Sequence, residues 1–340
     1  MVIDGAAVVV VTAAGVEADA TTSDVAGGSA SSPGAELHAA VRAKTATQSL
    51  TAVFTTCLSG CIIGSPTVPT ERRGVPSRAV TGQVHIRRNG AIGTIALDHP
   101  ERRNAISAGM WRGLLDAAHE LGDDDNIRAV VIRGEGEKAF AAGADISQFG
   151  AQRSSSDANA SYDDVTGQAY LALANMSKPL IAAIHGFCIG GGLAVALTAD
   201  IRIAADDAQF TIPAARLGLG YGAGGIGNLI RLVGPSAAKR IMFMADRFGP
   251  DEALNMGLIN KSVPKADLDA TVDEWAETIA GNAPLTIAAV KATVAEWVKD
   301  ESRRDFTTVE AMVKACFDSE DYKEGVDAFM HKRPAQFTGR

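Results

Sequence analysis

The chain has 340 residues, of which 46% are apolar and 21% are charged, so it is long enough to bury a core without disulfides or metal ions. Its formal net charge of -8 argues against a nucleic-acid partner, because phosphate contacts require a basic surface. Its four cysteines show no paired CxxC spacing. The sequence therefore predicts a reducing, cytoplasmic location and no metal site.

Residues 1–82 differ in composition from the rest of the chain. Residues 1–40 contain no Lys or Arg, and small residues dominate, so we predict a disordered extension. The uncompensated acidic residues argue against a mitochondrial transit peptide. The apolar run 50–64, which contains Cys61, resembles an export signal, but it is too short to cross a bilayer and lies far from Met1. We therefore expect no membrane association. Two alternatives remain for residues 1–82: an export signal, or a start codon assigned too far upstream.

Regular patterning begins at Gln83. The stretch VHIRRNGAIGTIALD alternates around Asn89-Gly90 and predicts an antiparallel hairpin. Ser107 is expected to cap a helix whose apolar residues recur at helical spacing up to Gly122. Two further strands are predicted at 128–133 and 180–184, with a polar loop over 154–164 between them.

Beyond Gly224 the chain is expected to be mostly helical. The predicted helices, separated by Pro, Gly or Asn, are 251–257, 266–279, 285–299 and 320–332. In the last of these, Ser319 would be the N-cap, and Lys332 and Arg333 would lie in the final turn, where positive charge suits the helix dipole.

Two glycine-containing turns carry the chemistry. In KAFAAGADI and in CIGGGL, a strand ends in a turn that can present backbone N–H groups at the start of a helix. A pair of such donors suits a thioester oxygen that becomes negatively charged. Tight helix–sheet packing also requires small residues, and for the triple glycine alone that structural interpretation is favoured. The two turns together favour an anion-stabilising site.

With these turns, the motifs HPERRNA, IAAIHGFCIGGGLAVALTADI and DSEDYKEGVDAFMHKR resemble the crotonase, or enoyl-CoA hydratase/isomerase, superfamily over residues 84–340. The resemblance implies an α/β fold, a crotonase-like spiral of ββα repeats, with a helical C-terminal region. The domains would be a 1–82 extension, an 83–265 spiral core and a 266–340 helical trimerisation region. It also implies an acyl-CoA substrate, no separate cofactor because coenzyme A is part of the substrate, and a homotrimer or dimer of trimers.

The resemblance also implies site residues. Ala144 and Gly191 would supply the oxyanion-hole amides. Substrate binding is expected from two further groups of residues. Along the coenzyme A path these are Arg103, Ala105, Ala142, Asp145 and Ile146; the others are Gly190, Pro213, and Phe329 and Lys332, which would reach the coenzyme A of a neighbouring subunit. For Asp145, a structural role as a helix cap is favoured over catalysis.

The chain departs from the family's hydratases at two positions. Hydratases carry glutamates where this chain has Ala194 and Ala214, and alanine cannot transfer a proton. Each missing acid or base is worth about 10² to 10⁴ in rate, so we predict poor hydration. Three functions remain open: an enoyl-CoA-type lyase or isomerase, a methylmalonyl-CoA-type decarboxylase, and a non-catalytic acyl-CoA binder.

Tyr221 is the third predicted catalytic residue. The segment PAARLGLGYGAGGIGNL resembles the decarboxylase branch, in which a tyrosine at this position would hold the substrate carboxylate, although that branch has a larger polar residue where Ala144 stands. Arg216 is equally a candidate for that carboxylate and a packing residue. His185 is expected to be a satisfied, partly buried structural histidine. The formal GxGxxG match at 220–225 is a weak dinucleotide motif, because Pro213 interrupts the strand it needs.

Overall fold

The computed structural model describes residues 82–145 and 156–340, all of them within one unit that spans Arg73–Arg340. The expectations for residues 1–81, namely the disordered extension and its export alternative, lie outside the described residues, as does the predicted site residue Ile146.

The strands form two sheets. The six-stranded sheet has the order β1-β2-β3-β5-β7-β9, in which β1 and β2 are antiparallel and the other pairs parallel, and the three-stranded parallel sheet has the order β4-β6-β8. The strands are β1 Gln83–Asn89, β2 Ile92–Asp98, β3 Ala129–Gly134, β4 Ala139–Ala141, β5 Leu180–Ile184, β6 Phe187–Ile189, β7 Ile201–Ala205, β8 Gln209–Thr211 and β9 Lys261–Val263.

Helices follow or connect these strands. They are α1 Ala108–Gly122, α3 Ser156–Ala174, α4 Gly191–Ala196, α5 Ala214–Leu217, α6 Ala223–Met244, α7 Pro250–Asn255, α8 Leu268–Gly281, α9 Pro284–Trp297, α10 Phe306–Asp318 and α11 Glu320–Met330. The predicted hairpin is confirmed, with Gly90 at a positive φ of 57°. The predicted cap of α1 is also confirmed, because the Ser107 side chain accepts a hydrogen bond from Met110 N.

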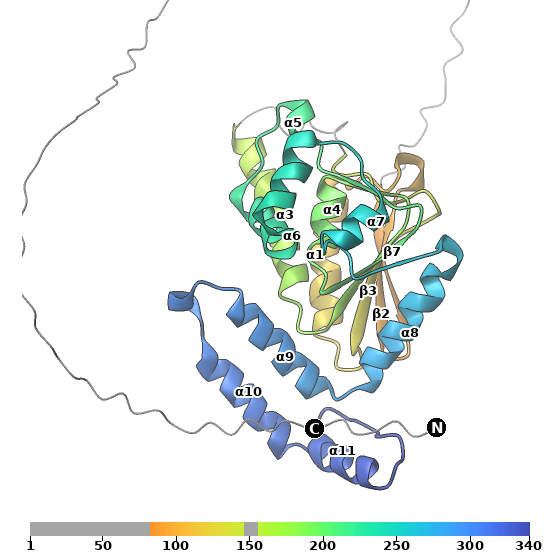
Figure 1. Ribbon diagram of the computed structural model, residues 1–340, viewed down its shortest axis with the longest axis vertical. Coiled ribbons are helices and arrows are strands. Elements are labelled where there is room, and N and C mark those ends of the chain that lie inside the picture. Colours follow the sequence, from red (N-terminus) through yellow and green to blue (C-terminus); the bar gives the residue numbers. More distant parts are fainter. Residues whose placement is uncertain (1–81, 146–155) are drawn as a thin grey trace, which may run out of the picture. The chain divides into compact units, whose positions relative to one another are not determined.

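The large sheet is covered on both faces. Alternate residues of the parallel strands enter two apolar clusters: Ile132 and Ala182 pack with α1, whereas Val131 and Ala183 pack with α8. In Figure 1, α1 and α8 accordingly lie on opposite sides of the sheet. Burial on both faces explains why β3 and β5 are apolar runs without the alternation of β1.

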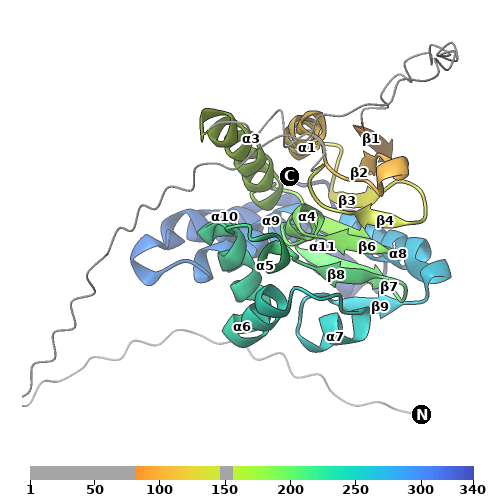
Figure 2. The same ribbon diagram turned by 90° about the horizontal axis from the view of Figure 1, so that it is seen from above.

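Each repeat contributes one strand to each sheet. The chain passes from β3 to β4, from β5 to β6 and from β7 to β8, so successive repeats place their second strands side by side in the small sheet. Figure 2 shows α4 and α5 beside one end of β6 and β8. The mixed α/β fold predicted from the resemblance is confirmed, and the described strands follow the predicted repeat.

Several local predictions were wrong. The polar loop expected over 154–164 is helical from Ser156, since the helix continues to Ala174 and its later turns pack on α1. The last helix ends at Met330, so Lys332 lies beyond it at a positive φ of 52° and Arg333 pairs with Glu324 instead of capping the helix. Helix α10 was not delimited from the sequence, although Asp305 accepts a hydrogen bond from Thr308 N at its start.

The C-terminal helices attach to the core through polar contacts. Arg128 donates hydrogen bonds to the carbonyl oxygens of Ala280 and Phe337, and Lys291 pairs with Asp200 at 2.7 Å. Helices α9 and α10 pack against each other as a hairpin (Figure 1). Among the described helices, none combines the length and the apolar composition needed to cross a membrane.

Candidate active site

Parallel pairing in the small sheet brings three chain segments together. Strands β4, β6 and β8 run in the same direction, so the residues that follow them meet at one edge. These segments are 142–145, 190–192 and 213–214. Gly190 N donates to Thr211 O at 2.8 Å, and a Cβ built on Gly190 would lie 3.8 Å from Pro213 Cδ. The predicted residues Ala144, Gly191 and Pro213 are thus neighbours in space.

The three consecutive glycines have different roles. Gly190 has φ 52° and ψ -114°, a conformation that favours glycine. A Cβ on Gly192 would lie 2.3 Å from the carbonyl oxygen of Ala141, so helix α4 packs on β4 only if this position has no side chain. The helix–sheet packing interpretation therefore holds for Gly192. It does not explain Gly191, whose Cβ would meet Ala144 N at 3.3 Å.

Two backbone amides face a common space. Gly143 O accepts from Ile106 N at 2.7 Å and Asp145 N donates to Ile106 O at 2.9 Å, so the intervening Ala144 N–H points to the other side of the strand. Gly191 N opens α4, where a helix has no internal acceptor. Within residues 82–145 and 156–340, neither N–H has a hydrogen-bond acceptor. This pair can bind the oxygen of a ligand.

One carboxylate stands near the amide pair. Residues 138–145, 187–196 and 209–216 contain a single acidic residue, Asp145. Its side chain is 6% exposed and accepts a hydrogen bond from Arg102 Nη1 at 3.1 Å. The helix that Asp145 was expected to cap lies outside the described residues. Since its charge is paired with Arg102, Asp145 is poorly suited to remove a proton.

The positions of the missing glutamates border the same space. Ala194 lies one turn into α4 and donates its N–H to Gly190 O at 2.9 Å. Ala214 begins α5 directly after Pro213 and is 4% exposed. Both positions therefore lie on segments that meet at this edge of the small sheet, Ala194 four residues after Gly190 and Ala214 next to Pro213.

Two aromatic residues near Gly191 were missed as site residues in the sequence analysis. Trp111 Cζ2 would lie 3.6 Å from a Cβ on Gly191, and the Tyr170 hydroxyl oxygen is 3.4 Å from the carbonyl oxygen of Gly191. Their rings meet edge to face with centroids 5.1 Å apart. Trp111 belongs to the apolar face of α1, and that periodicity gives no signal for a site.

Tyr221 precedes α6 and is half-buried. Its ring covers Gly225, where a Cβ would lie 2.7 Å from Tyr221 Cε1. Burial raises the pKa of the Tyr221 hydroxyl, which therefore stays protonated at neutral pH. Arg216, on α5, is exposed. The residues before Gly220 form a helix and not a strand, which contradicts the dinucleotide interpretation of the glycine motif.

A cavity of mixed charge lies at the amino ends of β4 and β6, because four carboxylates, those of Glu101, Glu135, Glu137 and Asp207, line it beside two cations. Arg103 and Lys138 both line two adjoining cavities of about 350 Å³ each, and the Arg103 guanidinium stands 4.6 Å above the Phe187 ring. Arg103 O accepts from Ala142 N, and Ala105 N donates to Arg102 O, so the loop that carries them is fixed by backbone contacts. Lys138 was not predicted as a site residue, although it is the first residue of the KAFAAGADI segment that the sequence singled out.

His185 directly follows β5 and is 3% exposed. Burial, and then the positive charges of Arg133 and Lys265, lower its pKa, so the ring is neutral. Its Nε2 atom has no partner among the described residues. The histidine is therefore more deeply buried than predicted and, contrary to the prediction, its Nε2 atom is not satisfied by any described residue.

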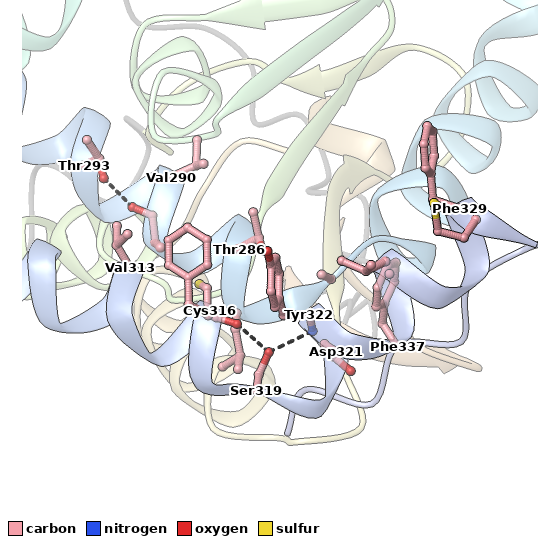
Figure 3. Close-up of a pocket in the computed structure, with 17 residues that line it drawn as sticks. Thr286, Val290, Thr293, Val313, Cys316, Ser319, Asp321, Tyr322, Phe329 and Phe337 are labelled. Atoms are coloured by element: carbon pink, nitrogen blue, oxygen red, sulfur yellow. Dashed lines mark hydrogen bonds between the residues drawn. The ribbon is translucent and has the colours of Figure 1, made fainter. Parts of the chain in front are cut away.

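Phe329 and Lys332 lie apart from the amide pair. Phe329 is 83% exposed and lines an apolar groove of about 650 Å³ that is formed by α9, α10, α11 and the C-terminal tail (Figure 3). Figure 3 shows Cys316 and Tyr322 among the residues that line this groove. In the described part of the chain, no group of three His, Cys, Asp or Glu residues could hold a metal ion.

The chain is similar to known proteins over most of its length. Residues 87–340 match the family described as enoyl-CoA hydratase/isomerase. A crotonyl-CoA hydratase of Syntrophomonas wolfei is 34% identical over 73% of this chain and 95% of its own length. A carnitinyl-CoA dehydratase of Escherichia coli is 34% identical over 76% of this chain and 98% of its own. The crystal structure of an enoyl-CoA hydratase/carnithine racemase from Magnetospirillum magneticum, 36% identical, superposes with a TM-score of 0.71 and covers 76% of this chain and 96% of that one.

Proposed function

This chain belongs to the enoyl-CoA hydratase/isomerase family, and from that premise we propose that it binds acyl-CoA thioesters and stabilises their enolates between the amides of Ala144 and Gly191. The observation that carries the proposal is that these two N–H groups adjoin and have no acceptor among the described residues. Placed on a thioester oxygen, each donor contributes about 2.7 to 4 kcal/mol to a developing negative charge.

Two cations in the cavities of mixed charge support the choice of a coenzyme A ester, since two of the four carboxylates there, Glu135 and Asp207, are paired with Arg87 and Lys265. Arg103 and Lys138 lie at the amino ends of β4 and β6, and the amide pair lies at their carboxyl ends. A ligand laid along these strands would place its phosphates on the two cations and its thioester on the amides. Ala105 and Ala142 would border this path with small side chains.

The described site lacks a free carboxylate, and this limits the reaction. Hydration requires a group that activates water and one that protonates carbon, whereas Ala194 and Ala214 can do neither. The hydratase and dehydratase activities named for the relatives therefore do not transfer directly to this chain. We propose an enoyl-CoA-type lyase or isomerase role in which enolate stabilisation is the main catalytic contribution.

Decarboxylation of a malonyl-type thioester is the second candidate. The bond between the α-carbon and the carboxylate breaks, its electrons enter the enolate held by Ala144 and Gly191, carbon dioxide leaves, and the α-carbon then takes a proton from water. No base is needed for the first step. The observation that favours it is the neutral, protonated Tyr221 hydroxyl after α5, which could donate to the substrate carboxylate, with Arg216 nearby in sequence.

One assay panel tests these proposals. Purified protein is offered crotonyl-CoA, a 3-enoyl-CoA and methylmalonyl-CoA, and each rate is compared with that of the Gly191→Pro variant. Position 191 is the first residue of α4, where proline leaves no helical hydrogen bond unmade, so the variant removes the donor. Because its Cβ would lie 3.3 Å from Ala144 N, circular dichroism checks that the variant keeps the fold. We expect a drop of about 10² to 10³ for the true substrate. If the wild type and the Gly191→Pro variant gave equal rates on all three thioesters, the chain would be a non-catalytic acyl-CoA binder.

The assembly is also part of the proposal. The groove between α9, α10 and α11 exposes large apolar side chains, and an exposed apolar patch marks an interaction surface. We propose that further copies of this chain cover the groove, in a trimer or a dimer of trimers. In that assembly Phe329 and Lys332 would contact coenzyme A held by a neighbouring copy. We place the protein in the cytoplasm.

A further inference from the structure

Two bulky aromatic residues stand beside the amide pair, and we infer that Trp111 and Tyr170 restrict the acyl group of the substrate to short chains. The inference rests on the proposed acyl-CoA function. It concerns the side of the amide pair that faces α1 and α3, whose residues do not line the two cavities beside Arg103 and Lys138.

The first step concerns where an acyl group can go. If the phosphates lie on Arg103 and Lys138, the acyl chain must leave the amide pair at its opposite side. There the described boundaries are α4 and α5, which present Ala194 and Ala214, and the aromatic pair from α1 and α3.

The second step concerns how rigid the aromatic boundary is. Trp111 is 1% exposed and packs in the main core, and its Cζ2 would lie 3.6 Å from a Cβ on Gly191. The Tyr170 ring meets Trp111 edge to face, and its hydroxyl reaches the Gly191 carbonyl oxygen at 3.4 Å. Because closely packed side chains do not yield to extra methylene groups without strain, a long acyl chain would collide with this pair.

Titration calorimetry of the full chain with saturated thioesters tests the inference, since acetyl-, butyryl-, hexanoyl- and octanoyl-CoA are not consumed by hydration or isomerisation. An open apolar channel would tighten binding by about fourfold per buried methylene. We expect affinity to rise from acetyl to butyryl and then to fall by at least about tenfold at octanoyl. Octanoyl-CoA binding as tightly as butyryl-CoA would overturn the inference alone, whereas no binding of any thioester would overturn the proposed function and this inference with it.

Variants identify the residues responsible. Tyr170→Leu and Trp111→Leu should each raise the octanoyl-to-butyryl affinity ratio by about tenfold, whereas Tyr170→Phe keeps the ring and should keep the wild-type ratio. Trp275→Leu is the matched control, because Trp275 packs on the second apolar cluster away from the site. Folding of each variant is checked by circular dichroism. An unchanged ratio in folded Tyr170→Leu and Trp111→Leu would overturn the assignment.

Discussion

The spiral core and the C-terminal helices α9 to α11 place their large apolar side chains in opposite ways. In the core, Phe140 and Phe210 are fully buried, whereas on α10 and α11 Phe317, Phe329 and Met330 are 60%, 83% and 72% exposed. Both regions contain regular helices with caps, so local sequence does not explain the difference. The core buries its large apolar side chains within one chain, whereas the C-terminal helices leave theirs exposed, on the surface that the proposed assembly would cover.

The two regions also contribute different chemistry. The core presents backbone N–H groups from Ala144 and Gly191, whose positions are fixed by strand pairing. The C-terminal region presents side chains, Phe329 and Lys332, which lie apart from those amides in one chain. The following predictions test this division, beginning with the largest effect.

The first prediction would break the assembly and leave the core intact. Phe317→Glu places a charge in the apolar groove, and an uncompensated charge in a buried interface costs about 3 to 5 kcal/mol. We expect sedimentation velocity at micromolar concentration to show monomers with an unchanged circular dichroism spectrum. Glu310→Gln, on the same helix outside the groove, should sediment like the wild type. A wild-type protein that is itself monomeric would contradict the comparison.

The second prediction concerns the core site. Ala194→Glu combined with Ala214→Glu supplies the two missing carboxylates, and we expect crotonyl-CoA hydration to rise by at least about 10² over the wild type. The measurement is the loss of absorbance of the enoyl thioester, with each single variant as a control. A wild type that already hydrates as fast as a two-glutamate relative would refute the argument from the alanines.

The third prediction tests the packing of the core. In Gly192→Ala the new methyl would lie 2.3 Å from Ala141 O, and overpacking of this kind costs about 1 to 3 kcal/mol. Gly227→Ala is the matched control, because nothing lies within 4 Å of its Cβ and alanine favours a helix by about 0.5 to 1 kcal/mol. Urea unfolding should therefore show opposite signs for the two substitutions. The same sign for both would mean that the α4–β4 contact is not tight.

The fourth prediction is a pH dependence of core stability. Because the pKa of His185 is lowered in the folded state, the unfolded state binds the proton first as the pH falls below about 6.5, and stability falls there by at most about 1.4 kcal/mol per pH unit. At pH values above that window the contribution is fully present. His185→Gln should flatten the dependence between pH 7.5 and 5 in urea titrations. Parallel curves for the two proteins would exclude the histidine as the cause.

The fifth and smallest effect concerns the C-terminal region. Lys332→Ala should weaken coenzyme A ester binding by several-fold and reduce its dependence on ionic strength, because an exposed contact with phosphate is screened by salt. Calorimetric titrations at low and high salt provide the slope. Lys323→Ala, which removes an exposed lysine paired with Glu320, is the control. Identical salt slopes for Lys332→Ala and wild type would remove Lys332 from the site.

The sequence by itself determined several core elements and the two turns, but not the start of α3 or the bounds of α10. Alternation around Asn89-Gly90, the Ser107 cap and the apolar runs of β3 and β5 are local patterns, and local backbone and packing preferences decide them. The absence of glutamate at positions 194 and 214 also needs no structure, since it follows from the residues and the family resemblance.

The tertiary structure decided which of these residues meet. Gly191 adjoins Ala144 only because β4 and β6 pair in parallel, with a shift of register between Ala139 and Ala141. Gly192 cannot bear a side chain only because α4 packs on Ala141. Trp111 and Tyr170 carry purely helical patterns, so nothing local marks their approach to Gly191. Contacts between distant segments depend on strand order and helix packing, which local periodicity does not encode.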